Sequence, residues 1–532
     1  DMGVTGVQTC ALPIYGGPAS VVEKLSPEEV DQLWVESPVA RFIREEASKQ
    51  QPRHIFLSGS AGDGKTTLLK KCAADLPEPT WHIEEDASGE DVPELQRRLS
   101  GFLGQGRRLA VAINRGQLDR LSGHLQEHDP AGELSGIIKA VKEGLKLRAT
   151  WTEEDLAPLE GVVSIDLSRQ DNLSEDLVEA VLERALSASA PSGPTAKAAF
   201  EAAKAILNEE EARGRLLKLL RAVAVTGEHV TMRDLWAYVA NLLTGGRPDD
   251  VDGGGEPVSL RDSVAVRMFE PSALMGTVTL ANLVRTSVDP AREPWPALNR
   301  ELLLQGLQGS LGGLEGLAPL MREEGAPVDG AQAVRIAWFH GHEGLRDWDP
   351  LAGQNRLFKK LVGDVSAEEG WLNKPALVKK LMAGLVKVVG LRVVGNDFPA
   401  WRRLAYQVGH REEAPLVANS NLTIADLRLG LPRPNPDARE ALKERYSIPY
   451  IWIAVAGDEY VRVGLTPRLA RAIEAPERAS VRRLPELEGV LGWLERLPTE
   501  ETEEVRVLTS KMSLTLTENL QERLELQRES VE

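Results

Sequence analysis

Cysteine is scarce in this chain, which has only Cys10 and Cys72 among its 532 residues. Two cysteines cannot build a disulfide framework or a four-ligand zinc site, so disulfide-stapled and zinc-finger-like proteins are excluded. Long apolar runs are missing as well. No stretch reaches the roughly 18 consecutive apolar residues that a membrane-spanning helix needs. We therefore predict a cytoplasmic protein of a reducing compartment, with no membrane partner.

Positive charge is in deficit. The 63 lysines and arginines stand against 80 aspartates and glutamates, which gives a net charge of −17 at pH 7. Extensive DNA binding depends on neutralising phosphates, so this balance is not typical of a dedicated nucleic-acid binder. We expect any DNA contact to be indirect. A net charge averages over the surface, however, and does not exclude a local basic face.

Regular periodicity is absent from the start of the chain. The run DMGVTGVQTCALPIY has no basic segment ahead of an apolar core, as a signal peptide would have. It resembles the translated adapter sequence found at the ends of metagenomic reading frames. We predict that residues 1–17 are a non-native leader.

The run GSAGDGKT, from Gly59 to Thr66, is the most informative stretch of the chain. It matches the phosphate-binding pattern G-x-x-x-x-G-K-T and lies between an apolar segment that suits a buried strand and a helical segment. Backbone N–H groups of such a loop close around phosphates, while Lys65 reaches the β- and γ-phosphates and the Thr66 hydroxyl binds Mg²⁺. We predict an ATP site with these nucleotide-binding residues: Gly59, Ser60, Ala61, Gly62, Asp63, Gly64, Lys65, Thr66 and Thr67.

A hydrolytic site of this kind usually needs a carboxylate at the end of a neighbouring strand. The clearest such strand, at 108–113, ends in Asn114, whose amide can orient water but cannot act as a base. Asp166, which follows Val162–Ile165 near the end of a strand predicted at 161–167, is our first candidate for the Mg²⁺ and catalytic acid, and Asp86 is the second. Asn114 is predicted to be a polar, sensor-like residue. The alternative for each of the three is a helix cap or a solvated side chain.

Arginines stabilise charge on a transferring phosphoryl group. Arg169, just after Asp166, is a candidate for this role, and Arg233 is a candidate for contacting phosphates from a helical lid. The alternative is that each is a surface residue. The predicted catalytic set is Lys65, Asp166, Asn114 and Arg169, and the predicted Mg²⁺ set is Thr66, Asp166 and Asp86.

The order of predicted elements indicates several domains. Strands alternate with helices near the glycine-rich loop, which predicts a doubly wound parallel sheet, an α/β P-loop NTPase core. A large all-helical region and a C-terminal α+β module follow, the latter with short strands at 450–454, 460–463 and 505–508 and a final helix at 517–526. The predicted divisions are a leader at 1–17, N-terminal helices at 18–50, the core at 51–175, the helical region at 176–385 and the module at 386–532.

Several runs together resemble the F component of DNA phosphorothioation-dependent restriction systems, the DptF-type proteins. They are LSGSAGDGKTTLL at 57–69, AVAINRGQL at 110–118 and HVTMRDLWAYVANLLTG at 229–245. The resemblance implies a bacterial, cytoplasmic, ATP-binding protein that works beside partners, including a helicase-like component, to restrict DNA lacking backbone sulfur. The resemblance also implies that the nucleotide ligands are Gly59, Gly62, Gly64, Lys65 and Thr66. It implies no nuclease residue.

Two functions from different classes follow. The first is an ATP-binding and ATP-hydrolysing subunit of such an anti-phage restriction system. The second is a nucleotide-sensing signalling or scaffold protein with little or no hydrolysis, which the amide at Asn114 favours. A metabolic kinase fits less well, because the helical and C-terminal parts exceed what such an enzyme needs.

Overall fold

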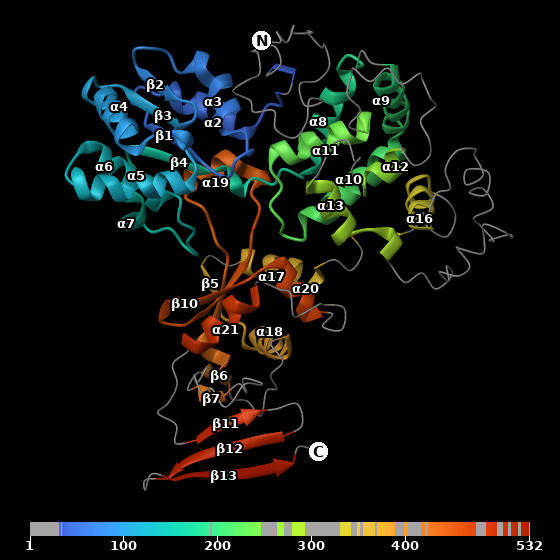
Figure 1. Cartoon of the computed structure of the whole chain (residues 1–532). Coiled ribbons are helices and arrows are strands. Elements are labelled where there is room, and N and C mark those ends of the chain that lie inside the picture. The colour runs from blue at the N-terminus through green and yellow to red at the C-terminus, as the bar shows by residue number, and fades with distance from the viewer. Residues whose placement is uncertain are drawn as a thin grey trace, which may run out of the picture. The chain divides into compact units, whose positions relative to one another are not determined.

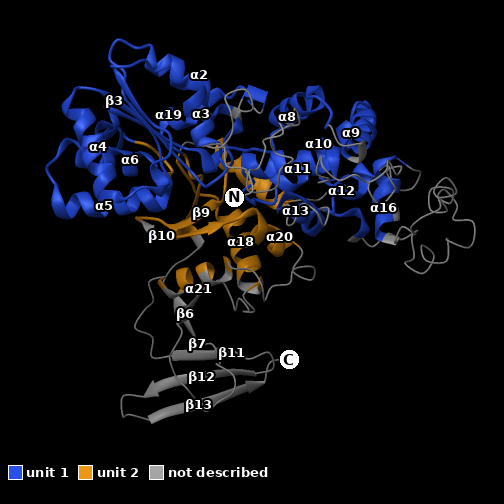
Figure 2. Cartoon of the chain, turned by 45° about the horizontal axis from the view of Figure 1, so that its top comes forward, with its two compact units in different colours: residues 1–146, 152–354, 434–447 blue, residues 147–151, 355–433, 448–532 orange. Residues whose placement is uncertain are grey.

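A computed structural model describes the chain in two compact units, coloured blue and orange in Figure 2. Unit 1 contains residues 1–146, 152–354 and 434–447, and unit 2 contains 147–151, 355–433 and 448–532. The leader predicted over 1–17 lies outside the described residues. The structure describes residues 31–32, 34–191, 194–245, 263–270, 279–292, 330–341, 348–351, 355–367, 370–388, 398–402, 416–420, 424–474, 486–496, 504–508, 512–519 and 523–530.

Unit 1 is built on a four-stranded parallel sheet in the order β2-β3-β1-β4. β1, β3 and β4 are mostly apolar, and all five residues of β1 and of β4 are buried, as expected where helices cover both faces of a sheet. The parallel α/β sheet predicted from the sequence is confirmed. Its strands are β1 (His54–Ser58), β2 (Trp81–Glu84), β3 (Arg108–Ala112) and β4 (Val162–Asp166).

Two groups of helices sandwich this sheet (Figure 1). One group shares an apolar core with β1, β3 and β4 that includes Leu68, Leu69 and Ala441. Its members are α2 (Pro38–Ala47), α3 (Lys65–Cys72) and, from far along the chain, α19 (Pro436–Leu442). The other group consists of α4 (Val92–Gly104), α5 (Arg115–His128) and α6 (Glu133–Gly144), and the short α7 (Glu153–Leu156) precedes β4.

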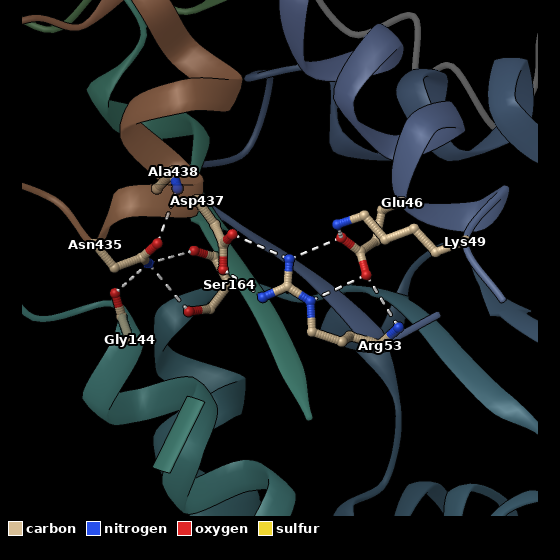
Figure 3. Close-up of polar contacts among 8 residues, drawn as sticks. All are labelled: Glu46, Lys49, Arg53, Gly144, Ser164, Asn435, Asp437 and Ala438. Carbon is tan, nitrogen blue, oxygen red and sulfur yellow. Dashed lines mark hydrogen bonds and ion pairs between the residues drawn. The ribbon is translucent and has the colours of Figure 1, made fainter. Parts of the chain in front are cut away.

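Asn435 fastens α19 to the sheet (Figure 3). Its side chain is buried, and its Oδ1 accepts a hydrogen bond of 2.8 Å from the Ala438 N–H, which caps the helix. Its Nδ2 donates to the carbonyl oxygens of Gly144 and Ser164, each at 2.8 Å. One side chain therefore starts α19 and joins it to the end of α6 and to β4.

Arg53 forms a second attachment of α19 (Figure 3). Its guanidinium donates to Asp437 at 2.8 and 3.0 Å and to Glu46 of α2 at 2.7 and 3.0 Å. Lys49 also donates to Glu46, at 2.6 Å. The Glu46 side chain is 1% exposed, so this ion pair is largely shielded from solvent.

Burial alone would raise the pKa of Glu46, but the hydrogen bonds from Arg53 and Lys49 outweigh it and lower that pKa to about 2. A folded-state pKa below the ordinary 4.5 means that folding favours the ionised form. The resulting contribution of about 3 kcal/mol is present above pH 4.5 and is lost as the pH falls towards about 2. We expect Glu46→Gln to lower stability at neutral pH and to flatten its decline over that acidic range.

Urea unfolding across this pH range checks the Glu46 prediction. Glu45→Gln is the matched control, because Glu45 is exposed on the same helix. The control should keep the stability and pH dependence of the wild type. Parallel curves for Glu46→Gln and the wild type would contradict the prediction.

The described residues of unit 1 after β4 and before residue 355 are mainly helical and have an apolar core of their own. The capping box of Thr231 and Asp234 starts α11, and Gly245, with a φ of 64°, ends it. The all-helical region predicted at 176–385 is confirmed for the described residues up to 341, but residues 355–385 belong to unit 2 and include a short strand at 371–372. The helices are α8 (Glu175–Ser187), α9 (Pro194–Leu207), α10 (Glu210–Ala224), α11 (Met232–Thr244), α12 (Val264–Arg267), α13 (Thr279–Ser287) and α16 (Gly330–Phe339).

Unit 2 contains an antiparallel sheet in the order β10-β9-β8-β5. Helices pack on one face of it around an apolar core that includes Leu429, Ile453 and Leu381. The strands are β5 (Trp371–Leu372), β8 (Leu427–Gly430), β9 (Ile451–Val455) and β10 (Asp458–Leu465). The helices are α17 (Arg356–Ser366), α18 (Pro375–Val388), α20 (Pro467–Glu474) and α21 (Glu486–Arg496).

A second sheet of unit 2 has the order β13-β12-β11-β7-β6. The helix predicted at 517–526 is wrong, because residues 517–519 and 523–526 belong to the antiparallel pair β12–β13, where Leu516 is opposite Leu526. The reason is local: Leu514, Thr515, Leu516 and Thr517 alternate with the period of a strand. The strands are β6 (Phe398–Arg402), β7 (Leu416–Ser420), β11 (Glu504–Leu508), β12 (Met512–Asn519) and β13 (Arg523–Ser530). No helix in the described parts of the chain is long and apolar enough to cross a membrane.

Candidate functional site

The glycine-rich loop joins the carboxyl end of β1 to the start of α3. Gly59 and Gly62 have φ angles of 146° and 96°, which L side chains rarely adopt. A Cβ atom on Gly59 would also come within 2.7 Å of the Asp63 carboxylate. Ser60 and Ala61 are exposed at the tip of the loop, and Thr67 is half-buried in the first turn of α3. The sequence thus forces a tight loop with an exposed tip in front of a helix.

Lys65 is the first residue of α3 and is folded back into the loop. Its Nζ donates to the carbonyl oxygens of Gly59 at 3.1 Å and Ser60 at 2.7 Å. Burial lowers the pKa of Lys65, and the carboxylates of Asp63, Asp86 and Asp166 oppose that shift only in part. The loop therefore holds a buried cation whose present partners are neutral carbonyl groups.

The carboxyl end of β2 lies beside Thr66. The Thr66 hydroxyl donates to the carbonyl oxygen of Glu85 at 3.0 Å, directly before Asp86. The Asp86 carboxylate accepts the Ser88 N–H at 3.0 Å, as the cap of a short 3₁₀ turn. The structure thus brings the two predicted Mg²⁺ ligands Thr66 and Asp86 to the same edge of the sheet.

Asp166 lies at the end of β4, in register with Ser58 of β1. One carboxylate oxygen accepts the Ser168 N–H at 3.1 Å and its hydroxyl at 2.6 Å. The other is paired with Arg115 and, at 3.5 Å, with Arg169. Burial by itself would raise the pKa of Asp166, but the charge of Arg115 and the bonds from Ser168 outweigh it and lower that pKa. Both oxygens therefore already have partners.

Asn114 caps α5 at the end of β3. Its Oδ1 accepts the Gln117 N–H at 2.8 Å, and its own N–H donates to the Ser88 hydroxyl at 3.1 Å. This is the helix-cap alternative for Asn114, and the contact with Ser88 also ties it to the turn that follows Asp86. A sensor-like role for Asn114 stays a prediction.

The helical part of unit 1 contacts the loop through the segment before α11. The Asp63 side chain is fully buried, and its carboxylate accepts the Ser60 N–H at 2.6 Å and lies 2.9 Å from Nε2 of His229. The Arg233 N–H donates to the Gly62 carbonyl at 3.1 Å. Arg233 also acts on the pKa of Lys65, which places its charge near the site.

Sequence reasoning missed two of these residues. His229 lies 166 residues from Asp63, and nothing local to either residue signals the pairing. Arg115 follows Asn114, and its partner, Asp166, is at the end of a different strand, so neighbouring residues do not signal this pair. Reading the strand order β3-β1-β4 would have been needed to find that pair.

The arrangement suits a bound polyanion with a divalent cation. A loop of backbone N–H groups, a buried lysine and the start of a helix attract phosphate, while carboxylates at two strand ends attract a metal ion. No three histidine, cysteine, aspartate or glutamate side chains are arranged to hold a metal on their own in the described residues. No protein-family model, curated protein or solved structure matches this chain.

Proposed function

We propose that unit 1 is a P-loop NTPase unit that binds ATP with Mg²⁺ at the Gly59–Thr66 loop. The observation that supports this most directly is Lys65, which is buried and folded onto the carbonyl groups of its own loop. On binding, Lys65 would exchange neutral partners for phosphate oxygens, which form stronger, charge-assisted hydrogen bonds. Calorimetric titration of the full chain with ATP and Mg²⁺ tests the proposal, and the absence of binding would refute it.

Asp86 is the acid that the contacts favour for the Mg²⁺ site. It adjoins the carbonyl group that the Thr66 hydroxyl contacts, whereas Asp166 is engaged by Ser168, Arg115 and Arg169. Bound Mg²⁺ neutralises charge that develops on the phosphates. Asp166 would then position Arg115 and Arg169, whose guanidinium groups are suited to phosphate oxygens.

We expect Asp86→Asn to lower the steady-state rate of ATP hydrolysis by at least about a hundredfold, because metal neutralisation contributes several kcal/mol to such reactions. Glu85→Gln is the matched control, since Glu85 is the preceding acid and pairs only loosely with Lys70, at 3.6 Å. The control should keep most of the activity. A normal rate for Asp86→Asn together with a lost rate for Asp166→Asn would assign the metal to Asp166 instead.

We propose further that the protein serves as the ATP-hydrolysing subunit of a bacterial DNA phosphorothioation-dependent restriction system, with a helicase-like partner. Three sequence segments that resemble this family, at 57–69, 110–118 and 229–245, support this proposal. Stimulation of hydrolysis by DNA, alone or with the partner present, tests it.

A nucleotide-sensing scaffold is the second candidate. The observation that favours it is that Asn114, at the end of the strand beside β1, offers an amide that caps α5 and no carboxylate. Tight ATP binding with a near-zero hydrolysis rate, unchanged by DNA, would select this function over the first.

A further inference from the structure

The antiparallel sheet of unit 2 has two different faces. Side chains alternate across a strand, so every second residue points away from the packed helices. The residues of one face belong to the apolar core: Leu372, Leu427, Leu429, Ile451, Ile453, Val455, Val463 and Leu465. The residues of the other face are Trp371, Arg428, Gly430, Trp452, Ala454, Arg462 and Gly464.

Arg428 and Arg462 flank a small residue on this second face. Both are in register with Ala454, so the three residues form one row across β8, β9 and β10. With strands about 4.8 Å apart, the two arginine side chains are long enough to reach one anion above Ala454. Arg428 is exposed, and neither arginine forms an ion pair with an acid in the described parts of the chain.

Aromatic residues make up the adjacent row. Trp371 is opposite Gly430, which is opposite Trp452, which is opposite Gly464. The glycines make room for the rings, because a Cβ atom on Gly430 would come within 2.7 Å of Trp371. The ring centres of Trp371 and Trp452 are 6.1 Å apart, and Tyr450 lies 5.9 Å from Trp452.

Arg462 joins the two rows. Its guanidinium carbon lies 4.0 Å from the centre of the Trp452 ring, which is a close cation–π contact. Trp371, Tyr450 and Arg462 are each half-buried, whereas Trp452 and Ala454 lie beneath them at 4% and 1% exposure. We call this surface, made of Trp371, Arg428, Tyr450, Trp452 and Arg462, the arginine–tryptophan face.

We propose that the arginine–tryptophan face binds single-stranded nucleic acid. Guanidinium groups recognise phosphate, and unstacked bases stack on aromatic rings and on guanidinium planes. A backbone phosphate sits over Ala454 between Arg428 and Arg462, and a neighbouring base stacks on Trp371. The net charge of −17 does not oppose this, because binding depends on the local face. The site is separate from the glycine-rich loop, and the proposal does not rest on ATP binding.

Fluorescence anisotropy with labelled oligo-dT and oligo-rU of about 12 nucleotides tests the proposal on the full chain, since one such site covers roughly 4–16 nucleotides. We expect the wild type to bind at least one of the two strands. Arg428→Ala with Arg462→Ala should weaken binding by at least about tenfold and reduce the slope of log Kd against log salt by about 0.7, the value for one lost phosphate contact on a single strand. Trp371→Ala should weaken binding roughly tenfold, and Trp371→Phe should restore most of it.

The matched control is Lys360→Ala with Lys380→Ala. Both lysines are exposed on α17 and α18, helices that pack on the apolar face of the sheet, so this variant loses the same two charges elsewhere. Its salt slope should stay that of the wild type. Lys65→Ala should bind the strands normally, which separates this site from the ATP site.

Three outcomes would overturn the proposal. The first is that the wild type binds neither strand. The second is that the double arginine variant and the double lysine variant lose the same affinity and the same slope, which would show a diffuse charge effect. The third is that poly-glutamate displaces oligo-dT as well as unlabelled oligo-dT does, which would make the face a site for acidic peptides. Circular dichroism and thermal melting of each variant verify that it is folded.

Discussion

Lys65→Ala will abolish measurable ATP binding, with an expected rise in Kd of roughly a hundredfold or more, equivalent to about 2.7 kcal/mol. The lysine is buried within the loop and holds two carbonyl oxygens that face inward. A charge-assisted contact to phosphate is worth about 1.5–3 kcal/mol, and here it would replace hydrogen bonds to neutral partners. Isothermal titration calorimetry with ATP and Mg²⁺ measures the change.

The control for this variant is Lys70→Ala. Lys70 is on the same helix, is only partly buried, and makes a single loose contact with Glu85. It should leave the affinity for ATP within about twofold of the wild type. Because Lys65→Ala also leaves the Gly59 and Ser60 carbonyl groups without this donor, its melting temperature must be measured alongside. Wild-type ATP affinity in Lys65→Ala would remove the basis for the proposed nucleotide site.

Asn435→Ala will destabilise unit 1 by about 3 kcal/mol, since it removes three buried hydrogen bonds, each worth about 1 kcal/mol. Two of them end on the carbonyl groups of Gly144 and Ser164, which would stay buried without this donor. The third is the cap of α19. Urea unfolding, with hydrogen exchange of peptides from β4 and α19, measures the loss and shows where it occurs.

Two companion variants sharpen the Asn435 experiment. Asn435→Asp keeps the oxygen that caps α19 but cannot donate to the two carbonyl groups, so it should destabilise unit 1 at least as much as alanine does. Arg439→Ala changes an exposed residue of α19 and should cost less than about 0.5 kcal/mol. If Asn435→Ala matched Arg439→Ala, the side chain would not be what holds α19.

The parts of the fold that could be predicted from the sequence are those with local causes. Three of the four parallel strands, β1, β3 and β4, are short and mostly apolar runs between helices, and the glycine-rich loop follows β1 with its spacing intact. Local patterns gave a wrong prediction at 517–526. The charged, helix-forming residues there favour a helix, whereas the alternation of leucine and threonine at 514–517 indicates the strand that the structure contains.

The contacts that attach α19 to the sheet and those that complete the candidate site are non-local, so the sequence could not predict them. Asn435 lies 271 residues from Ser164 and 291 from Gly144, and His229 lies 166 from Asp63. Each of these residues is an ordinary polar side chain in its own segment. From the sequence, Asp166 is the first candidate for the Mg²⁺ acid because it follows a buried strand. Its ion pair with Arg115 is visible only in the structure. Pairings of this kind depend on how the layers assemble.

The late position of α19 in the chain has a consequence for synthesis. About 270 residues separate β4 from the helix that covers it, and ribosomes add about 5–20 residues per second. The nascent chain therefore spends roughly 15–50 s with one side of the central sheet bare where Ala438, Ala441 and Leu442 will pack. A chain whose synthesis stops in that interval keeps this part of the sheet uncovered, which is the kind of apolar surface that chaperones bind.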